Sequence, residues 1–176
     1  MERVKAILAL VAIVALAVPA AALARDSSDV TEDLSRPIVT ARGVGAVHLG
    51  DTIRSLHRRH LIRYLRPGCE LEAGQRVARL SRLNGFAIFG PSSNRVRSIS
   101  VRGGARTAKG VTIGSSPGLA LHAYPEAEYS PPGSNPPFDI GLIWVNNRET
   151  PRMTFIVDPE SNRISELSIP QPSFCE

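Results

Sequence analysis

Residues 91–96 read PSSNRV and residues 159–164 read PESNRI, so one six-residue pattern occurs twice at an offset of 68 residues. The match resumes after a short gap, where Ile99-Ser100-Val101 corresponds to Leu167-Ser168-Ile169. Upstream, VHLGDT at 47–52 corresponds to VTIGSS at 111–116, at an offset of 64. The four-residue difference falls where the second copy alone carries a Pro-rich loop, SPPGSNPP at 130–137. Two matches in the same order predict a tandem repeat that organises the chain.

Each copy predicts a helix just after its glycine, because Asp51-Thr52 and Ser115-Ser116 are good N-cap residues. In the second copy, Pro117 suits the first helical position and Pro125 ends the helix. In the first copy, side chains recur at helical spacing at Ile53, Leu56, His60, Leu61, Tyr64 and Leu65. A helix reaching Leu65 is therefore expected there.

Antiparallel strands are expected after each helix. Turn residues at 90–94 and 158–162 separate alternating apolar runs and predict hairpins. Further strands are predicted at 77–81 and 138–145. The predicted fold class is α+β, with two tandem repeats of a helix and a meander of about three strands in one compact domain. Its parts are a flexible lead-in at 25–42, repeat unit 1 at 43–106, and repeat unit 2 at 107–176.

The first 24 residues, MERVKAILALVAIVALAVPAAALA, have the features of a secretory signal peptide. Arg3 and Lys5 precede an apolar run from Ala6 to Val18, which is too short to span a membrane. Cleavage is predicted after Ala24, with an uncleaved N-terminal anchor as the alternative. The chain is then secreted or lies at the exterior of the cell envelope, with no membrane span after cleavage. Cleavage lowers the formal net charge from +5 to +4, since two cations and one anion are removed.

Cys69 and Cys175 are the only cysteines. In an oxidising compartment, two thiols in a short secreted domain usually form a disulfide. The loop closed would span about 106 residues, for which the chain-entropy model gives roughly 4–5 kcal/mol of stabilisation. Two free thiols or an intermolecular bridge are the alternatives.

The Gly-x-[Ser/Thr] helix start, short helix and antiparallel meander in tandem resemble two secreted groups. These are the beta-lactamase inhibitory protein and the single-copy SmpA/OmlA lipoproteins. The resemblance covers roughly Gly43 to Ile169 and rests on the matches around Gly50, Gly114 and the two hairpins. It implies a binding module with a sheet surface. This chain has no lipidated cysteine, and no inhibitor contact residue can be carried over.

Candidate binding residues lie on the predicted basic helix and around the Pro-rich loop. The helix has a run of basic residues that suits an anionic ligand, although a solvated helix face is the alternative. Tyr129 belongs to a loop stiffened by prolines, and loops often carry binding residues. Few aromatic residues accompany the arginines, so no nucleic acid is expected. The candidate surface comprises Arg58, Arg59, Arg63, Arg66, Tyr129 and Trp144.

Enzymatic and metal chemistry have weak support. Gly114-Ser115-Ser116-Pro117-Gly118 fits the G-x-S-x-G pattern of a nucleophile elbow. The one downstream histidine, His122, falls on the same short helix, so it is badly placed to be a base. His57 and His60 lack a third ligand, and no cofactor or metal is expected. The sequence therefore predicts a secreted, non-enzymatic binding module at or outside the bacterial cell envelope, whose partner, a protein or an anionic envelope polymer, it does not identify. The alternatives are a binder of anionic envelope polymer that acts through the Arg-rich helix, and a hydrolase of unknown class.

Overall fold

A computed structural model describes residues 36–68, 73–134 and 137–173. The predicted signal peptide, the lead-in as far as residue 35, and both cysteines lie outside the described residues. Within the described ranges, no helix is long and apolar enough to cross a membrane.

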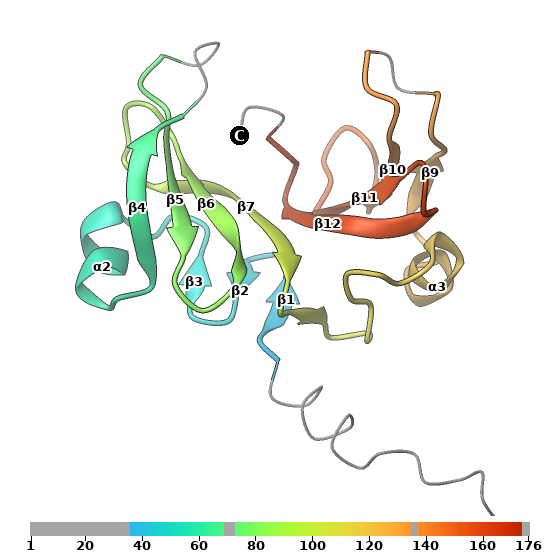
Figure 1. The fold of residues 1–176 in the computed structure, drawn as a ribbon, viewed down its shortest axis with the longest axis horizontal. Coiled ribbons are helices and arrows are strands. Elements are labelled where there is room, and N and C mark those ends of the chain that lie inside the picture. The colour runs from blue at the N-terminus through green and yellow to red at the C-terminus, as the bar shows by residue number, and fades with distance from the viewer. Residues whose placement is uncertain (1–35, 69–72, 135–136, 174–176) are drawn as a thin grey trace, which may run out of the picture.

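The structure is mostly β, with antiparallel pairing throughout its large sheet. The eight strands of this sheet lie in the order β4-β5-β6-β7-β12-β11-β10-β9 (Figure 1). Their bounds are β4 Ile62–Pro67, β5 Arg76–Leu80, β6 Asn84–Phe89, β7 Val96–Gly103, β9 Glu128–Ser130, β10 Gly141–Val145, β11 Met153–Asp158 and β12 Arg163–Ile169. Two short helices, α2 (Ile53–Arg58) and α3 (Pro117–Ala123), precede β4 and β9 respectively. A helix therefore comes before four consecutive strands in each half of the chain.

The first helix is shorter than its apolar spacing predicts. Thr52 caps it by accepting a hydrogen bond from Ser55 N, but it ends at Arg58. Residues 62–67 instead form β4, which pairs with β5 through a bulge between Arg63 and Arg66. The helical prediction for this stretch was wrong, because Tyr64 and Leu65 are exposed rather than part of a buried helix face.

The lead-in is also shorter than predicted. Ile38–Thr40 forms strand β1, which pairs with β2 (Gly43–Val44) and, in parallel, with β8 (Arg106–Thr107). Together with β3 (Val47–His48), these strands make a second, four-stranded sheet. The prediction of a flexible segment was wrong for residues 38–42, since backbone pairing fixes this stretch and Val39 is buried.

The loop before each helix is bonded in the same way to the hairpin of its own half. In both halves, a glycine N–H donates to a strand carbonyl, and the N–H of the same strand residue donates back to the residue after the glycine. The pairs are Gly50 N to Val96 O (2.8 Å), Val96 N to Asp51 O (2.8 Å), Gly114 N to Ile164 O (2.8 Å) and Ile164 N to Ser115 O (2.9 Å). Both glycines have a positive φ, 85° and 88°, which glycine adopts without strain.

The two halves meet where β7 pairs with β12. The register aligns Ile99 with Ile169, Ser100 with Ser168 and Val101 with Leu167. Ser100 and Ser168, which correspond in the sequence match, are thus direct partners, and their hydroxyls lie 3.0 Å apart. The eight-stranded sheet is continuous through this pair.

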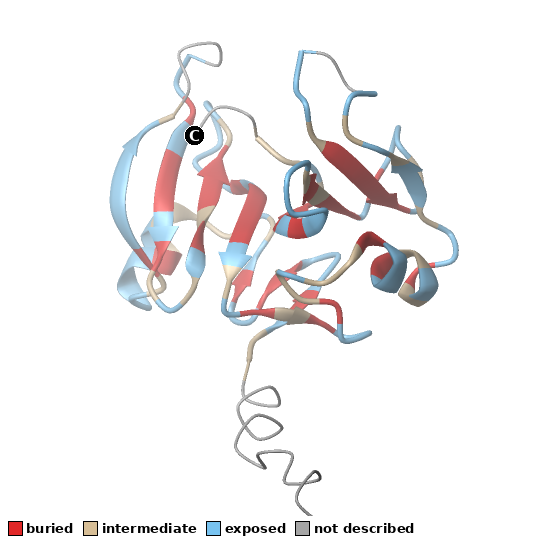
Figure 2. Ribbon diagram, turned by 45° about the vertical axis from the view of Figure 1, so that its right-hand side comes forward, coloured by how far each residue is buried: buried red, intermediate tan, exposed pale blue. Residues whose placement is uncertain are grey.

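The main core lies on one face of the large sheet, under the two helices. Leu56 of α2 and Ala120 of α3 belong to it together with strand residues such as Phe89 and Phe155, all of them fully buried. Figure 2 shows buried residues along the central strands and exposed ones on β4. A side chain at the edge of this sheet is therefore more accessible to a ligand than one at its centre.

The turn between β11 and β12 predicts how the folding stability of the protein changes at acid pH. Asp158 Oδ1 accepts hydrogen bonds from Ser161 Oγ (2.7 Å) and Ser161 N (2.8 Å), and these bonds lower the pKa of the Asp158 carboxyl. A lowered folded-state pKa contributes stability that is present above the unfolded pKa, about 3.9, and lost as pH falls through the folded value.

We therefore expect Asp158→Asn to be less stable than wild type at pH 7, and to lose less stability on acidification to about pH 3. Urea unfolding at several pH values measures both effects. Asp139→Asn makes the same charge change and serves as the control. Parallel stability profiles for wild type and Asp158→Asn would contradict the prediction.

Candidate functional site

The large sheet has a second face that carries no helix, which we call the helix-free face. Side chains alternate along a strand, so the residues immediately before and after a core residue point to this face. None of its residues belongs to the main core cluster. On the six central strands they are Val77, Arg79, Phe86, Ile88, Ser98, Ser100, Arg102, Leu142, Trp144, Thr154, Ile156, Glu166 and Ser168.

A polar chain crosses the middle of the helix-free face. Arg102 Nε lies 2.9 Å from Glu166 Oε2, and Glu166 Oε1 accepts a hydrogen bond from Ser168 Oγ at 2.9 Å. Ser168 Oγ in turn lies 3.0 Å from Ser100 Oγ. The Glu166 side chain is only 6% exposed, whereas that of Arg102 is 44% exposed. Glu166 therefore holds one edge of the Arg102 guanidinium, and much of the rest faces solvent.

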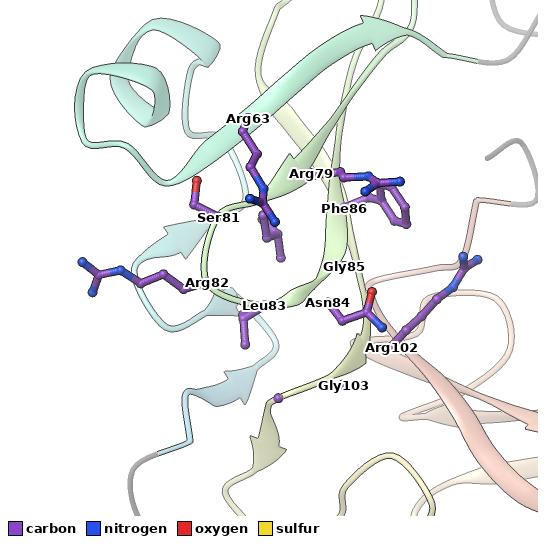
Figure 3. A pocket seen from close by; sticks show the side chains of 12 residues that line it. Arg63, Arg79, Ser81, Arg82, Leu83, Asn84, Gly85, Phe86, Arg102 and Gly103 are labelled. Atoms are coloured by element: carbon purple, nitrogen blue, oxygen red, sulfur yellow. The ribbon is translucent and has the colours of Figure 1, made fainter.

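Arginines surround a pocket of about 780 Å³ beside the β5–β6 hairpin, which we call the basic pocket. Arg63, Arg79 and Arg102 line it, and Figure 3 shows Arg82, also part of its wall, extending away from these three. The Arg102 guanidinium carbon lies 5.6 Å from the centroid of the Phe86 ring, a cation–π distance. Among the residues that the structure describes, no acidic one lines the basic pocket.

Positive charge accumulates over the whole first half of the sheet. The described residues between 62 and 103 contain eight arginines and no aspartate or glutamate. Glu70 and Glu72 lie outside the described residues. From 104 to 173 the balance reverses, with seven acidic residues and five basic ones among those described. The sheet is therefore electrostatically uneven, with its basic end at β4–β7.

The chain after β12 covers the centre of the helix-free face. Ser98 Oγ donates to the carbonyl of Gln171 at 2.7 Å, and Thr154 Oγ1 donates to the carbonyl of Pro170 at 2.9 Å. In Figure 1 this segment turns up between the two halves of the sheet. None of its described residues, 170–173, lines the basic pocket.

A smaller hollow of about 460 Å³ adjoins the basic pocket across Arg102. Its other walls include Phe138, which is 44% exposed, together with Ile140 and Ile156. Arg102 and Glu166 thus separate an arginine-lined region from a more apolar one.

The structure does not gather the six residues of the predicted binding surface into one site. Arg63 lines the basic pocket, and Arg66 lies farther along β4, opposite Val77. Arg58 and Arg59 stay at the end of α2, where Arg59 donates to Ala46 O at 2.9 Å and lies 3.9 Å from Asp51.

Tyr129 and Trp144 lie in the other half of the sheet. Tyr129 pairs with Ile143, a core residue, so its side chain is on the opposite face from the basic pocket. Trp144 is on the helix-free face but is only 7% exposed, with the Arg148 guanidinium 5.3 Å from its ring centroid. Arg79, Arg102 and Glu166 were missed. In RVARL at 76–80, the alternation of side chains places Arg79 on the opposite face from Ala78. The sequence does not show that Arg79 lies near Arg102, because that depends on which strands are neighbours.

The serine of the G-x-S-x-G pattern has a structural role. Ser116 Oγ accepts a hydrogen bond from Leu119 N at 3.3 Å and so caps α3, as its place after Gly114 predicts. The neighbouring Ser115 Oγ accepts from Thr112 N at 3.1 Å. Among the described residues, no three His, Cys, Asp or Glu side chains form a group that could hold a metal ion.

Comparison with known proteins does not assign the chain. No protein-family model, curated protein or solved structure matches it. The functional argument therefore rests on the geometry and charge of the helix-free face.

Proposed function

We propose that this chain is an exported, non-enzymatic binding protein that holds an anionic ligand at the basic end of its helix-free face. The observation that carries the proposal is that Arg63, Arg79 and Arg102 line one pocket on this face, in a segment whose described residues, 62 to 103, contain eight arginines and no acidic residue. Local excess charge of one sign raises the concentration of oppositely charged ligands and speeds their association. The predicted signal peptide would direct the chain to or beyond the bacterial cell envelope, where anionic ligands include acidic partner proteins, anionic polymers, phosphorylated small molecules and lipid headgroups.

The proposal includes a tandem architecture: two α+β units of one helix and four strands, related by an approximate two-fold axis between Ser100 and Ser168. The four matching bonds between helix-start loops and hairpins support it. The β7–β12 register also supports it, because the corresponding residues Ser100 and Ser168 pair directly and their neighbours pair symmetrically on either side. In this arrangement the charge difference between the halves is the feature that distinguishes one unit from the other.

The resemblance to secreted tandem-repeat binding proteins is compatible with this role. In that architecture the sheet face without helices is available to a ligand. The two units have similar backbones and different side chains, so one can bind while the other serves mainly as scaffold.

Binding to dextran sulfate, compared with neutral dextran, tests the proposal. We expect the mature wild-type chain to bind only the sulfated polymer, and more weakly as salt rises from about 0.05 M to about 0.3 M. The double variant Arg63→Gln/Arg79→Gln should weaken this binding about tenfold, because it removes two charge-assisted contacts.

Arg54→Gln/Arg58→Gln is the matched control, since it removes the same charge from the exposed face of α2. A smaller loss in this control than in the Arg63/Arg79 variant supports the helix-free face. The reverse order would assign the ligand to the basic helix, and equal losses would show binding by net charge alone. Either result would contradict the proposal.

A further inference from the structure

We propose that the basic pocket is a binding site for a phosphate monoester. This inference rests on the proposed function and names the chemical class of its ligand. Free phosphorylated small molecules and the phosphorylated headgroups of envelope lipids share this chemistry, and the experiment below separates the two sources.

The strongest observation is a pair of like charges placed directly opposite each other. Arg63 of β4 and Arg79 of β5 are register partners, and both line the basic pocket. Opposed residues on neighbouring antiparallel strands have Cβ atoms about 5 Å apart, and like charges there are destabilising. No ion pair joins either arginine to an acidic residue among those described. An anion between the two guanidinium groups would remove this repulsion.

Charge balance favours a ligand with two negative charges. Arg102 already has a carboxylate partner in Glu166, and Arg82 extends away from the other arginines (Figure 3), so Arg63 and Arg79 leave two positive charges without an acidic partner among the described residues that line the pocket. A phosphate monoester carries about −1.5 to −2 at pH 7, whereas a carboxylate or a sulfate ester carries one negative charge. The planar guanidinium also matches phosphate oxygens through paired hydrogen bonds.

One side of the pocket is held in place before any ligand arrives. Glu166 fixes the Nε edge of Arg102, and the Phe86 ring lies under its guanidinium carbon at 5.6 Å. Figure 3 shows Arg63, Arg79 and Arg102 distributed around Phe86 and the start of β6. A guanidinium already ordered in this way loses less conformational entropy on binding.

The walls and size of the pocket favour a compact organic phosphate over inorganic phosphate alone. Leu83 and Phe86 contribute apolar surface, and Asn84 contributes an amide. A volume of about 780 Å³ lies within the range of roughly 300–1,000 Å³ found for small-molecule sites. The phosphate would contact the arginines, and its organic group would contact Phe86 and Leu83.

Titration calorimetry with three matched probes tests the inference: phenyl phosphate, phenyl sulfate and benzoate. We expect phenyl phosphate to bind at least about tenfold more tightly than either monoanion. Its affinity should fall below about pH 6, where the monoester loses its second charge, while that of phenyl sulfate stays constant. Arg63→Ala/Arg79→Ala should abolish the preference, and Arg54→Ala should leave it intact.

Vesicle flotation identifies the source of the phosphate. Phosphatidic acid carries a phosphate monoester and phosphatidylglycerol a diester, each mixed into phosphatidylcholine at equal surface charge. Retention by phosphatidic acid alone, lost in Arg63→Ala/Arg79→Ala, assigns the site to a lipid headgroup. Binding of phenyl phosphate without vesicle retention assigns it to a free small molecule.

Equal affinity for the three probes, or a preference that survives Arg63→Ala/Arg79→Ala, would overturn the inference. If the same arginines are still needed for dextran sulfate, the proposed function stands and only the phosphate assignment fails. If neither dextran sulfate nor the phenyl probes bind at these arginines, both proposals fail.

Discussion

Arg102→Ala is expected to lower the free energy of unfolding by about 2–4 kcal/mol, because it leaves the buried Glu166 carboxylate without its cation. Glu166→Gln should cost less, about 1 kcal/mol, since a glutamine oxygen still accepts a hydrogen bond. The asymmetry follows from burial: the Glu166 side chain is 6% exposed, and that of Arg102 is 44% exposed. Arg102 can regain water when its partner is lost, and Glu166 cannot.

Urea unfolding of the variants measures this difference as a shift in midpoint at unchanged slope. Arg79→Ala is the control, since Arg79 is an exposed arginine on the same face with no ion pair among the described residues, and a change within about 0.5 kcal/mol is expected. The double variant Arg102→Ala/Glu166→Leu should recover much of the loss, because apolar groups can replace a buried pair. Equal destabilisation by Arg102→Ala and Arg79→Ala would show that the Glu166 pair contributes nothing.

Removal of the predicted disulfide is expected to have the larger effect, about 4 kcal/mol for a loop of about 106 residues. Cys69→Ser, Cys175→Ser and the double variant should all lose the same stability, because either substitution opens the loop. Reduction should lower the melting temperature of the wild-type mature chain to that of the double variant. It should leave the melting temperature of the double variant unchanged.

The linkage is tested directly, since both cysteines lie outside the described residues. Peptide mapping without reduction identifies the linkage. A melting temperature insensitive to reductant, or only unlinked cysteine peptides, would contradict the prediction.

Features set by neighbouring residues could be predicted. Thr52 and Ser116 cap their helices, and the turn residues at 90–94 and 158–162 separate paired strands. The wrong prediction of a helix extended to Leu65 has a physical cause. Residues 60 and 64 adopt positive φ, and β5 supplies backbone partners for 62–67 that a continued helix would forgo.

The candidate site was less predictable than the fold. Of the six residues in the predicted surface, only Arg63 lines the basic pocket, and its neighbours Arg79 and Arg102 come from other strands. Spacing in one strand shows which residues share a face. It does not show which residue of the next strand stands beside them, because that depends on register and bulges.

The sequence by itself determined the two capped helix starts and the two hairpins, because these depend on backbone preferences and hydrogen bonds within a few residues. The export signal and the disulfide of this protein stay predictions. Only the tertiary structure decided that β4 is a strand, that Arg63 stands opposite Arg79, and that Glu166 holds Arg102 beside them. Those contacts join residues far apart in the chain, and only the register of the complete sheet brings them together.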